Sequence, residues 1–264
     1  EGAKAAADSV LKVNLVGATP LDYSVNGSVE SIAEWIENAG MKVNSNFGMK
    51  GTAYDFRRAG EADLNLVLSY GGLEAAKYMK RAMGIPYVVG VPYGKANADR
   101  LAAEMRSAVA GTEAGNEAEA INEVEAINEA EVASGIEVGS RTVAVIGEPV
   151  TSVALAKAIE QEYGVKTVVL AATECCKELL REGDEEVPSE AQVIRALRRI
   201  KPDAVVADPF YQIICTRAVC GRDIPFCRRP HEAFSGRIYD RENANLIDKP
   251  LDAELKLSSL PGLG

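Results

Sequence analysis

The sequence of 264 residues lacks most of the short motifs that identify an enzyme class. No G-x-S-x-G elbow is present, and the chain has one histidine, His231, so a serine triad would depend on that residue alone. No G-x-G-x-x-G fingerprint follows an expected strand, and no G-x-x-x-x-G-K-[ST] loop occurs. Hydrolase chemistry and a dinucleotide or P-loop nucleotide site are therefore disfavoured.

Long apolar runs and export signals are also missing. No stretch approaches the ~18 consecutive apolar residues of a membrane helix, and no basic region followed by an apolar one stands at the N-terminus. Five cysteines are an odd number in a chain too large to need disulfide staples. We therefore expect a cytoplasmic protein with free or metal-bound thiols and no membrane partner. The chain begins at Glu1 without an initiator Met, which favours a fragment or a processed form.

Basic residues are absent from one part of the chain. Residues 112–140 hold eight glutamates and neither Lys nor Arg, whereas the rest has 31 acidic against 29 basic residues. Eight of the ten net negative charges therefore belong to one segment, and a field that attracts nucleic acid is not expected. Within this segment, Glu-Ala-Ile-Asn-Glu occurs at 119–123 and again at 125–129. An acidic surface helix or mobile linker is the first interpretation, and a partner-binding helix is the second.

What the chain does contain is an alternation of strand and helix patterns. Apolar runs predict strands at 11–16, 41–44, 64–68, 85–89, 142–146, 165–171, 204–207 and 224–227. Apolar spacing with Gly or Pro at the ends predicts helices at 28–38, 72–83, 97–110, 149–163, 174–181, 189–200 and 209–219. Such alternation implies βαβ units. The predicted fold class is therefore α/β, with two Rossmann-like domains, 1–111 and 141–264, whose parallel sheets are flanked by helices and which the acidic segment 112–140 joins.

Chemistry is expected in the loops after the strands, because ligands of parallel sheets collect there beside helix N-termini. Cys215, Cys220 and Cys227 have the spacing C-x4-C-x6-C, which matches no common zinc or ferredoxin pattern, so packing is the first interpretation. Cys175 and Cys176 stand at an expected strand-to-helix turn, where a reactive or ligating thiol is the alternative to packing.

His231 follows two arginines and a proline. It is either a hydrogen-bonded loop histidine or a metal ligand or proton donor. In the second case four nearby arginines could form a basic pocket that attracts carboxylates. They are Arg217, Arg222, Arg228 and Arg229.

Several segments, in their order and spacing, resemble one known family. They are Asn14–Asp22, Asn65–Tyr70, Gly84–Gly94, Ile146–Val150, Ala207–Pro209 and Ile224–Gly236. Together they are similar to the nitrogenase component 1 family, which includes the dinitrogenase subunits, their cofactor-assembly scaffolds, and the reductases of protochlorophyllide, chlorophyllide and nickel-sirohydrochlorin. The resemblance covers most of 11–247 except the acidic segment. It implies that the chain corresponds to the second and third of three Rossmann-like domains.

The resemblance also implies an iron–sulfur cofactor. The cysteines that bridge the family's interface cluster come from the first domain, so the usual ligands are expected to be absent or altered in this chain. Where the dinitrogenase α subunit has a Cys-Tyr pair whose Cys holds the active-site metal cluster, this chain has Ser69-Tyr70. A serine hydroxyl is a poor iron ligand, which disfavours dinitrogen reduction. Ser69 and Gly71 are nevertheless expected to line the cofactor cleft.

The same subunit uses a histidine shortly before a Ser-Gly pair as its second protein ligand. His231, four residues before Ser235, lies one position away from that place. The resemblance therefore implies that His231 acts as a proton donor, or as a metal ligand together with Cys227.

In function, the resemblance implies a nitrogenase-like oxidoreductase component. It would accept low-potential electrons from an ATP-dependent iron–sulfur reductase, associate with a homologous subunit, and reduce a bound substrate. The alternative is a scaffold for assembly of a nitrogenase-type metal cluster, which binds without turnover. A third possibility is an interaction protein that uses the acidic segment and has lost redox chemistry. The complete protein is expected to be the active form, and this chain alone to be inactive.

Overall fold

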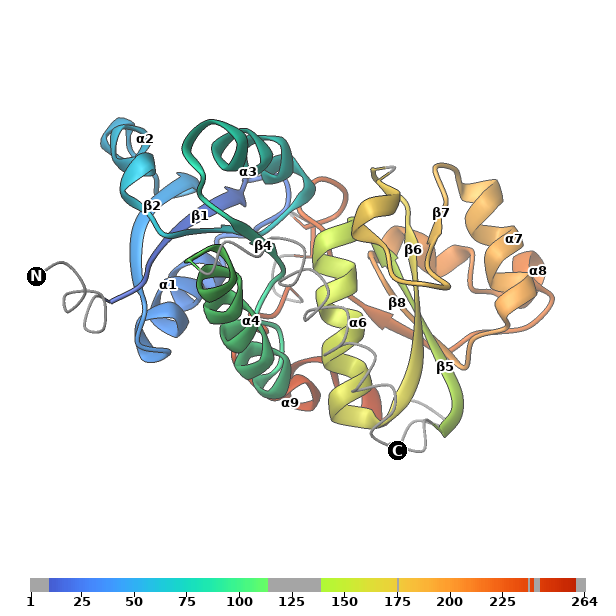
Figure 1. The fold of residues 1–264 in the computed structure, drawn as a ribbon. Helices are drawn as coiled ribbons and strands as arrows, with labels where there is room; N and C mark the ends of the chain where they lie inside the picture. Colours follow the sequence, from blue (N-terminus) through green and yellow to red (C-terminus); the bar gives the residue numbers. More distant parts are fainter. Residues whose placement is uncertain (1–9, 114–138, 175, 237, 240–242, 260–264) are drawn as a thin grey trace, which may run out of the picture.

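The computed structural model describes residues 10–113, 139–174, 176–236, 238–239 and 243–259. Figure 1 shows two α/β halves beside each other, the first in blue to green and the second in yellow to orange. Most of the acidic segment, including both copies of its repeat, lies outside the described residues, and so does Cys175.

The first half contains a parallel sheet of four strands in the order β2-β1-β3-β4. The strands are β1 (Lys12–Ala18), β2 (Lys42–Gly48), β3 (Leu64–Val67) and β4 (Tyr87–Val89). The helical elements are α1 (Ser28–Asn38), α2 (Ala53–Arg58), η1 (Ala59–Glu61), α3 (Tyr70–Met83) and α4 (Lys95–Glu113). The central strands β1 and β3 are buried almost throughout, as expected for apolar runs inside a parallel sheet.

Local signals explain where the helices of this half begin and end. Gly40 follows α1 with a φ of 73°, and Gly84 ends α3 with a φ of 72°, a conformation that costs glycine little. The sequence did not predict α2, which buries none of its residues and therefore has no apolar period. Instead, the Asp55 carboxylate accepts the backbone N–H and the hydroxyl of Thr52, which caps its first turn.

The second half contains five parallel strands in the order β7-β6-β5-β8-β9. The strands are β5 (Gly139–Gly147), β6 (Val165–Ala171), β7 (Glu185–Glu186), β8 (Ala204–Ala207) and β9 (Phe226–Arg228). The helical elements are α6 (Pro149–Tyr163), η2 (Lys177–Leu179), α7 (Glu190–Ile200), η3 (Pro209–Ile213), α8 (Arg217–Cys220), α9 (Leu251–Leu255) and η5 (Leu257–Ser259). These two parallel sheets flanked by helices confirm the predicted α/β fold class. None of the described helices is long and apolar enough to cross a bilayer.

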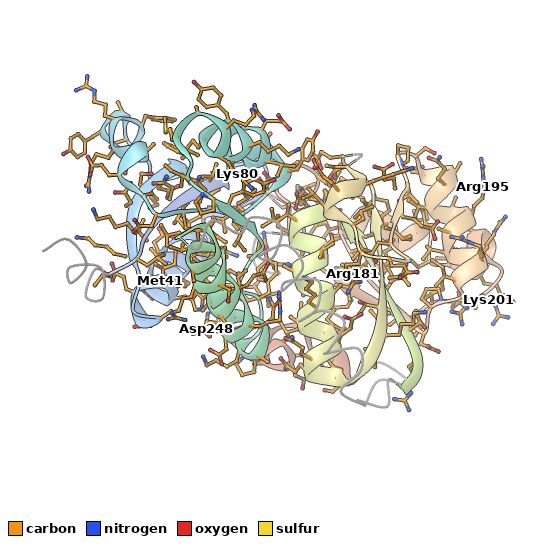
Figure 2. All side chains as sticks on the ribbon, in the orientation of Figure 1. Met41, Lys80, Arg181, Arg195, Lys201 and Asp248 are labelled. Carbon is orange, nitrogen blue, oxygen red and sulfur yellow. The ribbon has the colours of Figure 1, made fainter. Side chains whose placement is uncertain are left out.

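The helix predicted over 174–181 is wrong, because the described part of this stretch has only the 3-10 turn η2. Leu179 and Leu180 are adjacent and both pack against the core, whereas one helix face buries residues three or four apart. Arg181, labelled in Figure 2, then donates to Asp184 and Glu160. These tertiary hydrogen bonds stabilise a loop in a stretch whose apolar spacing predicted a helix.

The helix predicted over 209–219 is divided into η3 and α8. Ile214 and Cys215 are adjacent and only 5% and 3% exposed, so both point into the core. Thr216 has an extended backbone, with φ −89° and ψ 158°, and it separates the two short elements. Burial of neighbouring side chains therefore overrides helix propensity here.

The chain after β9 returns to the first half. Asn245 donates to the Ser31 hydroxyl of α1 at 2.9 Å, and Ile247 forms an antiparallel bridge with Tyr93. α9 then packs against α6. This segment, which the sequence placed in the second domain, thus also contacts the first half. The predicted domain boundaries stay a prediction.

The apolar core is continuous between the halves. One cluster contains Leu15 and Leu66 from the first sheet together with Val145 and Ile159 from the second half. α4 and α6 lie side by side at this interface (Figure 1). The two halves are therefore joined by apolar packing, and a polar cleft opens where the loops after their strands meet.

Candidate active site in the cleft between the two halves

Loops that follow β1, β5, β8 and β9 line one cleft, as the carboxyl ends of the strands of both sheets come together. Its polar and aromatic lining includes Asp22, Tyr93, Glu148, Asp208, Arg229 and His231. The cleft is partly open to solvent, and its volume is about 50 Å³, which is room for a few water molecules or for one small group of a larger ligand.

His231 occupies a turn after β9 that fixes the state of its ring. Its Nδ1 accepts the backbone N–H of Ala233 at 3.2 Å, an N–H that also donates to the Leu21 carbonyl at 3.0 Å. With Nδ1 as an acceptor, a neutral ring carries its proton on Nε2. Nε2 is buried and has no hydrogen-bond partner among the described residues. It faces Oδ1 of Asp22 at 3.6 Å, which is too long for a direct hydrogen bond. The N–H group is therefore available to a ligand atom or a bridging water.

Asp22 reaches the same place from the loop after β1. The Thr19 hydroxyl donates to its Oδ2 at 2.7 Å. Burial raises the pKa of the Asp22 carboxyl, but His231, Thr19 and Ser69 favour the charged form more strongly, so this pKa lies below its ordinary value. Asp22 is therefore an anion that faces the imidazole from the opposite half.

Asp208, at the end of β8, holds the histidine turn in place. It is 3% exposed, and its Oδ2 accepts the backbone N–H of His231 at 2.9 Å and the Ser235 hydroxyl at 2.6 Å. Its Oδ1 accepts the Phe210 N–H at 2.9 Å. Both carboxylate oxygens are thus used to position the turn, and the imidazole itself stays free to face the cleft.

Glu148, directly after β5, is a second buried carboxylate in the lining. It is 1% exposed and accepts hydrogen bonds from Tyr70 in the first half and from Thr151 in its own half. Burial raises its pKa, although the hydrogen bonds from Thr151 and Tyr70 oppose this.

Only one of the four arginines considered from the sequence lines the cleft. Arg229 donates to Asn243 Oδ1 at 2.8 Å and to the Ala244 carbonyl at 2.7 Å, and its guanidinium lies 5.6 Å from the centroid of the Tyr93 ring. Arg195 of α7 and Lys201, the residue after this helix, lie at the outer side of the second half, away from the cleft (Figure 2). The cleft is therefore mixed in charge rather than basic.

Ser69 and Gly71 lie beside the cleft but are not among the residues that line it. The Ser69 hydroxyl is fully buried and donates to the Gly17 carbonyl at 2.7 Å, where it joins β1 to the start of α3. Gly71 is exposed, and a Cβ there would meet only ordinary contacts at 3.7 Å. The cofactor-binding role expected for both residues stays a prediction.

An iron–sulfur cluster does not fit the described thiols. Cys227 packs in the core, its Sγ donates to the Leu255 carbonyl at 3.4 Å, and burial raises its pKa to about 11. Burial also raises the pKa of Cys215 to about 12, and it raises the pKa values of Cys176 and Cys220. No group of three potential metal ligands comes together in the part of the chain that the structure describes.

Cys227 and His231 therefore lie in different surroundings, one in the core and the other in the cleft. The metal-ligand role predicted for the two residues stays a prediction. The sequence patterns pointed to His231 but did not single out Asp22, Asp208 or Glu148. Each of these carboxylates directly follows an expected strand or stands in the loop after it, and that position was the available signal.

Comparisons with known proteins show which proteins this chain is similar to. The chain is 31% identical over 172 residues to a subunit of the light-independent protochlorophyllide reductase of Rhodospirillum rubrum, covering 64% of this chain and 31% of that protein. It is 27% identical over 225 residues to the corresponding subunit from Halorhodospira halophila, covering 82% of this chain and 42% of that protein. The chain thus spans well under half the length of these relatives.

Among solved structures, nitrogenase Cp1 at pH 5 matches with a TM-score of 0.51 and 15% identity, over 84% of this chain and 52% of the nitrogenase chain. At this identity the match describes the fold alone. The family model of nitrogenase component 1 type oxidoreductases matches residues 2–228. With the two parallel sheets and the cleft at their carboxyl ends, this match establishes that the chain belongs to the nitrogenase component 1 type oxidoreductase family.

Proposed function

We propose that the chain is part of a nitrogenase-like reductase in which the cleft holds the reacting group of the substrate and His231 supplies it with a proton. The observation that supports this most directly is the His231 Nε2–H, which is buried, has no partner among the described residues, and faces an ionised aspartate. Unpaired buried polar groups are rare in folded proteins, and each calls for an explanation such as a catalytic role or a bound ligand.

The proposed reaction needs protons as well as electrons. A double bond that gains two electrons also takes up two protons, so a reductase must hold a donor beside the bond. In this proposal the electrons come from an ATP-dependent iron–sulfur reductase through a complex with a homologous subunit. The chain itself contributes the orientation of the substrate and one of the two protons. This proton leaves Nε2 of His231 as solvent returns a proton to the same nitrogen, so the ring stays neutral, and the second proton comes from solvent.

Three features of the chain support the role of His231. Asp208 and Ser235 fix the turn, the Ala233 N–H fixes the orientation of the ring, and Asp22 gives the Nε2–H a negative charge to point toward. Such preorganisation places the donor without cost at the moment of reaction. Because the described thiols do not fit a cluster, the proposal assigns the ligands of any iron–sulfur centre to residues outside the described part of the chain.

The test is the turnover of the complete protein, assembled with its partner subunit and reductase, after the substitution His231→Gln. We expect turnover to fall roughly 100-fold, the usual range for loss of a general acid, with a small change in substrate binding. Glu232→Gln, a change on the same turn at a residue outside the described lining, is the matched control. Full turnover in His231→Gln would contradict the proposal. Tight cluster binding without any turnover in the unmodified protein would instead favour an assembly scaffold.

A further inference from the structure

Glu148 makes a contact that joins the two halves inside the cleft. Its Oε2 accepts the Thr151 N–H at 2.7 Å and the Thr151 hydroxyl at 2.8 Å, and both bonds stay within the second half. Its Oε1 accepts the N–H of Tyr70 at 2.8 Å, and Tyr70 is the first residue of α3 in the first half. One carboxylate therefore satisfies backbone donors at the N-termini of two helices, α6 and α3, from different halves.

Two opposing effects act on the charge of this carboxyl group. α3 has 14 residues and α6 has 15, and each directs the positive end of its dipole at Glu148. A neutral amide has one acceptor oxygen and cannot serve both helix ends, whereas a carboxylate has two. Burial raises the pKa of Glu148, and the hydrogen bonds from Thr151 and Tyr70, which favour the charged form, offset this only in part.

The proposed proton donor depends on the same interface. Asp22 belongs to the first half and His231 to the second, so the 3.6 Å separation between Oδ1 and Nε2 exists only while the halves keep their relative position. The loops are also linked at the outer side, where the Ala233 N–H donates to the Leu21 carbonyl at 3.0 Å. Glu148 provides the buried link on the inner side, in the lining itself.

We infer that Glu148 is a positioning residue, whose carboxylate holds the start of α3 against the start of α6 and thereby sets the approach of Asp22 to His231. The inference rests on the proposed function, since it concerns the geometry of the proton donor named there. It does not give Glu148 contact with the substrate.

The test uses the substitution Glu148→Asp in the full chain. An aspartate keeps the charge and is a good N-cap for α6, but its side chain is one methylene shorter and cannot also reach Tyr70. Thr151→Ala is the matched control, because it removes the Thr151 hydroxyl from Glu148 and leaves the bond to Tyr70 intact. Glu148→Gln is a second variant that keeps the length of the side chain and removes its charge.

Two readouts separate positioning from general stability. One is the hydrogen exchange rate of the Tyr70 amide, and the other is the pair of imidazole ¹⁵N signals, which in this chain come from a single histidine. We expect Glu148→Asp to accelerate Tyr70 exchange at least about tenfold, as a local opening does, and to move the Nε2 signal of His231. Thr151→Ala should leave both readouts as they are in the unmodified chain.

An unchanged Tyr70 exchange rate and unchanged imidazole signals in Glu148→Asp would overturn the inference. If Glu148→Gln fails to fold, the comparison of Glu148→Asp with Thr151→Ala still decides the question. The outcome is also separate from that of the proposed function. Full turnover in His231→Gln would remove the proton-donor role, whereas the two readouts here test only the position of the ring.

Discussion

At the scale of single residues, the charge of Asp22 decides how the cleft works. Its carboxylate accepts the Thr19 hydroxyl on one oxygen and faces His231 with the other. The hydrogen bonds that favour its charged form outweigh the cost of burial. An aspartate that stays ionised presents a negative charge to the imidazole N–H, which a protonated carboxyl does not.

The lowered pKa of Asp22 predicts a specific acid sensitivity. Because its pKa in the folded chain lies below that in the unfolded chain, Asp22 stabilises the fold above the unfolded pKa, about 3.9 for aspartate. This contribution is lost as the pH falls through the folded pKa. Asp22→Asn should therefore make the free energy of unfolding depend less steeply on pH below about 4. Urea unfolding at a series of pH values measures this slope, and identical slopes in the two proteins would refute the assignment.

At the scale of elements, the start of α3 is set by close contact with β1. A Cβ on Gly72 would stand 2.6 Å from the Val16 carbonyl oxygen, and one on Gly17 would stand 2.9 Å from the Gly72 nitrogen. Gly17 also has a φ of 91°, a conformation unfavourable for other residues. This crowding brings the first turn of α3, and with it the Tyr70 N–H, to the edge of the cleft.

Two adjacent glycines of α3 provide a matched test of that contact. Gly72→Ala should destabilise the fold by about 2 kcal/mol or more, because the added methyl group overlaps backbone atoms that cannot move aside. Gly71→Ala meets only contacts at 3.7 Å, so it should change stability by less than about 1 kcal/mol, and the better helix propensity of alanine favours a gain. Thermal or urea unfolding of the two variants measures the difference. Equal effects would show that the packing at Gly72 is looser than described.

At the scale of the whole molecule, sequence patterns predicted the architecture well because both sheets are parallel and buried. Runs such as Leu64–Val67 and Ala204–Ala207 are buried along their whole length, so each reads directly as an inner strand. The patterns failed where tertiary contacts decide the backbone, as in the loop that Arg181 holds against Glu160 and Asp184. A single-segment pattern contains no information about such partners.

In the candidate site, too, some features could be predicted from the sequence and others could not. His231 could be identified from the sequence because it is the single histidine and stands in a loop after an expected strand. Its relation to Asp22 could not, since the two residues are far apart in the chain and meet only when the halves pack together. Glu148 was part of a recognised segment, but its bond to Tyr70 likewise depends on the interface.

The most direct test of the proposed site is the ¹⁵N spectrum of the one imidazole ring, recorded under conditions where the ring is neutral, in the unmodified chain and in Asp22→Asn. We predict a neutral ring with its proton on Nε2 in the unmodified chain, and a shifted Nε2 signal once the carboxylate is replaced. A ring that carries its proton on Nδ1, or an Nε2 signal that does not respond to Asp22→Asn, would contradict the central claim that His231 and Asp22 form one site across the cleft.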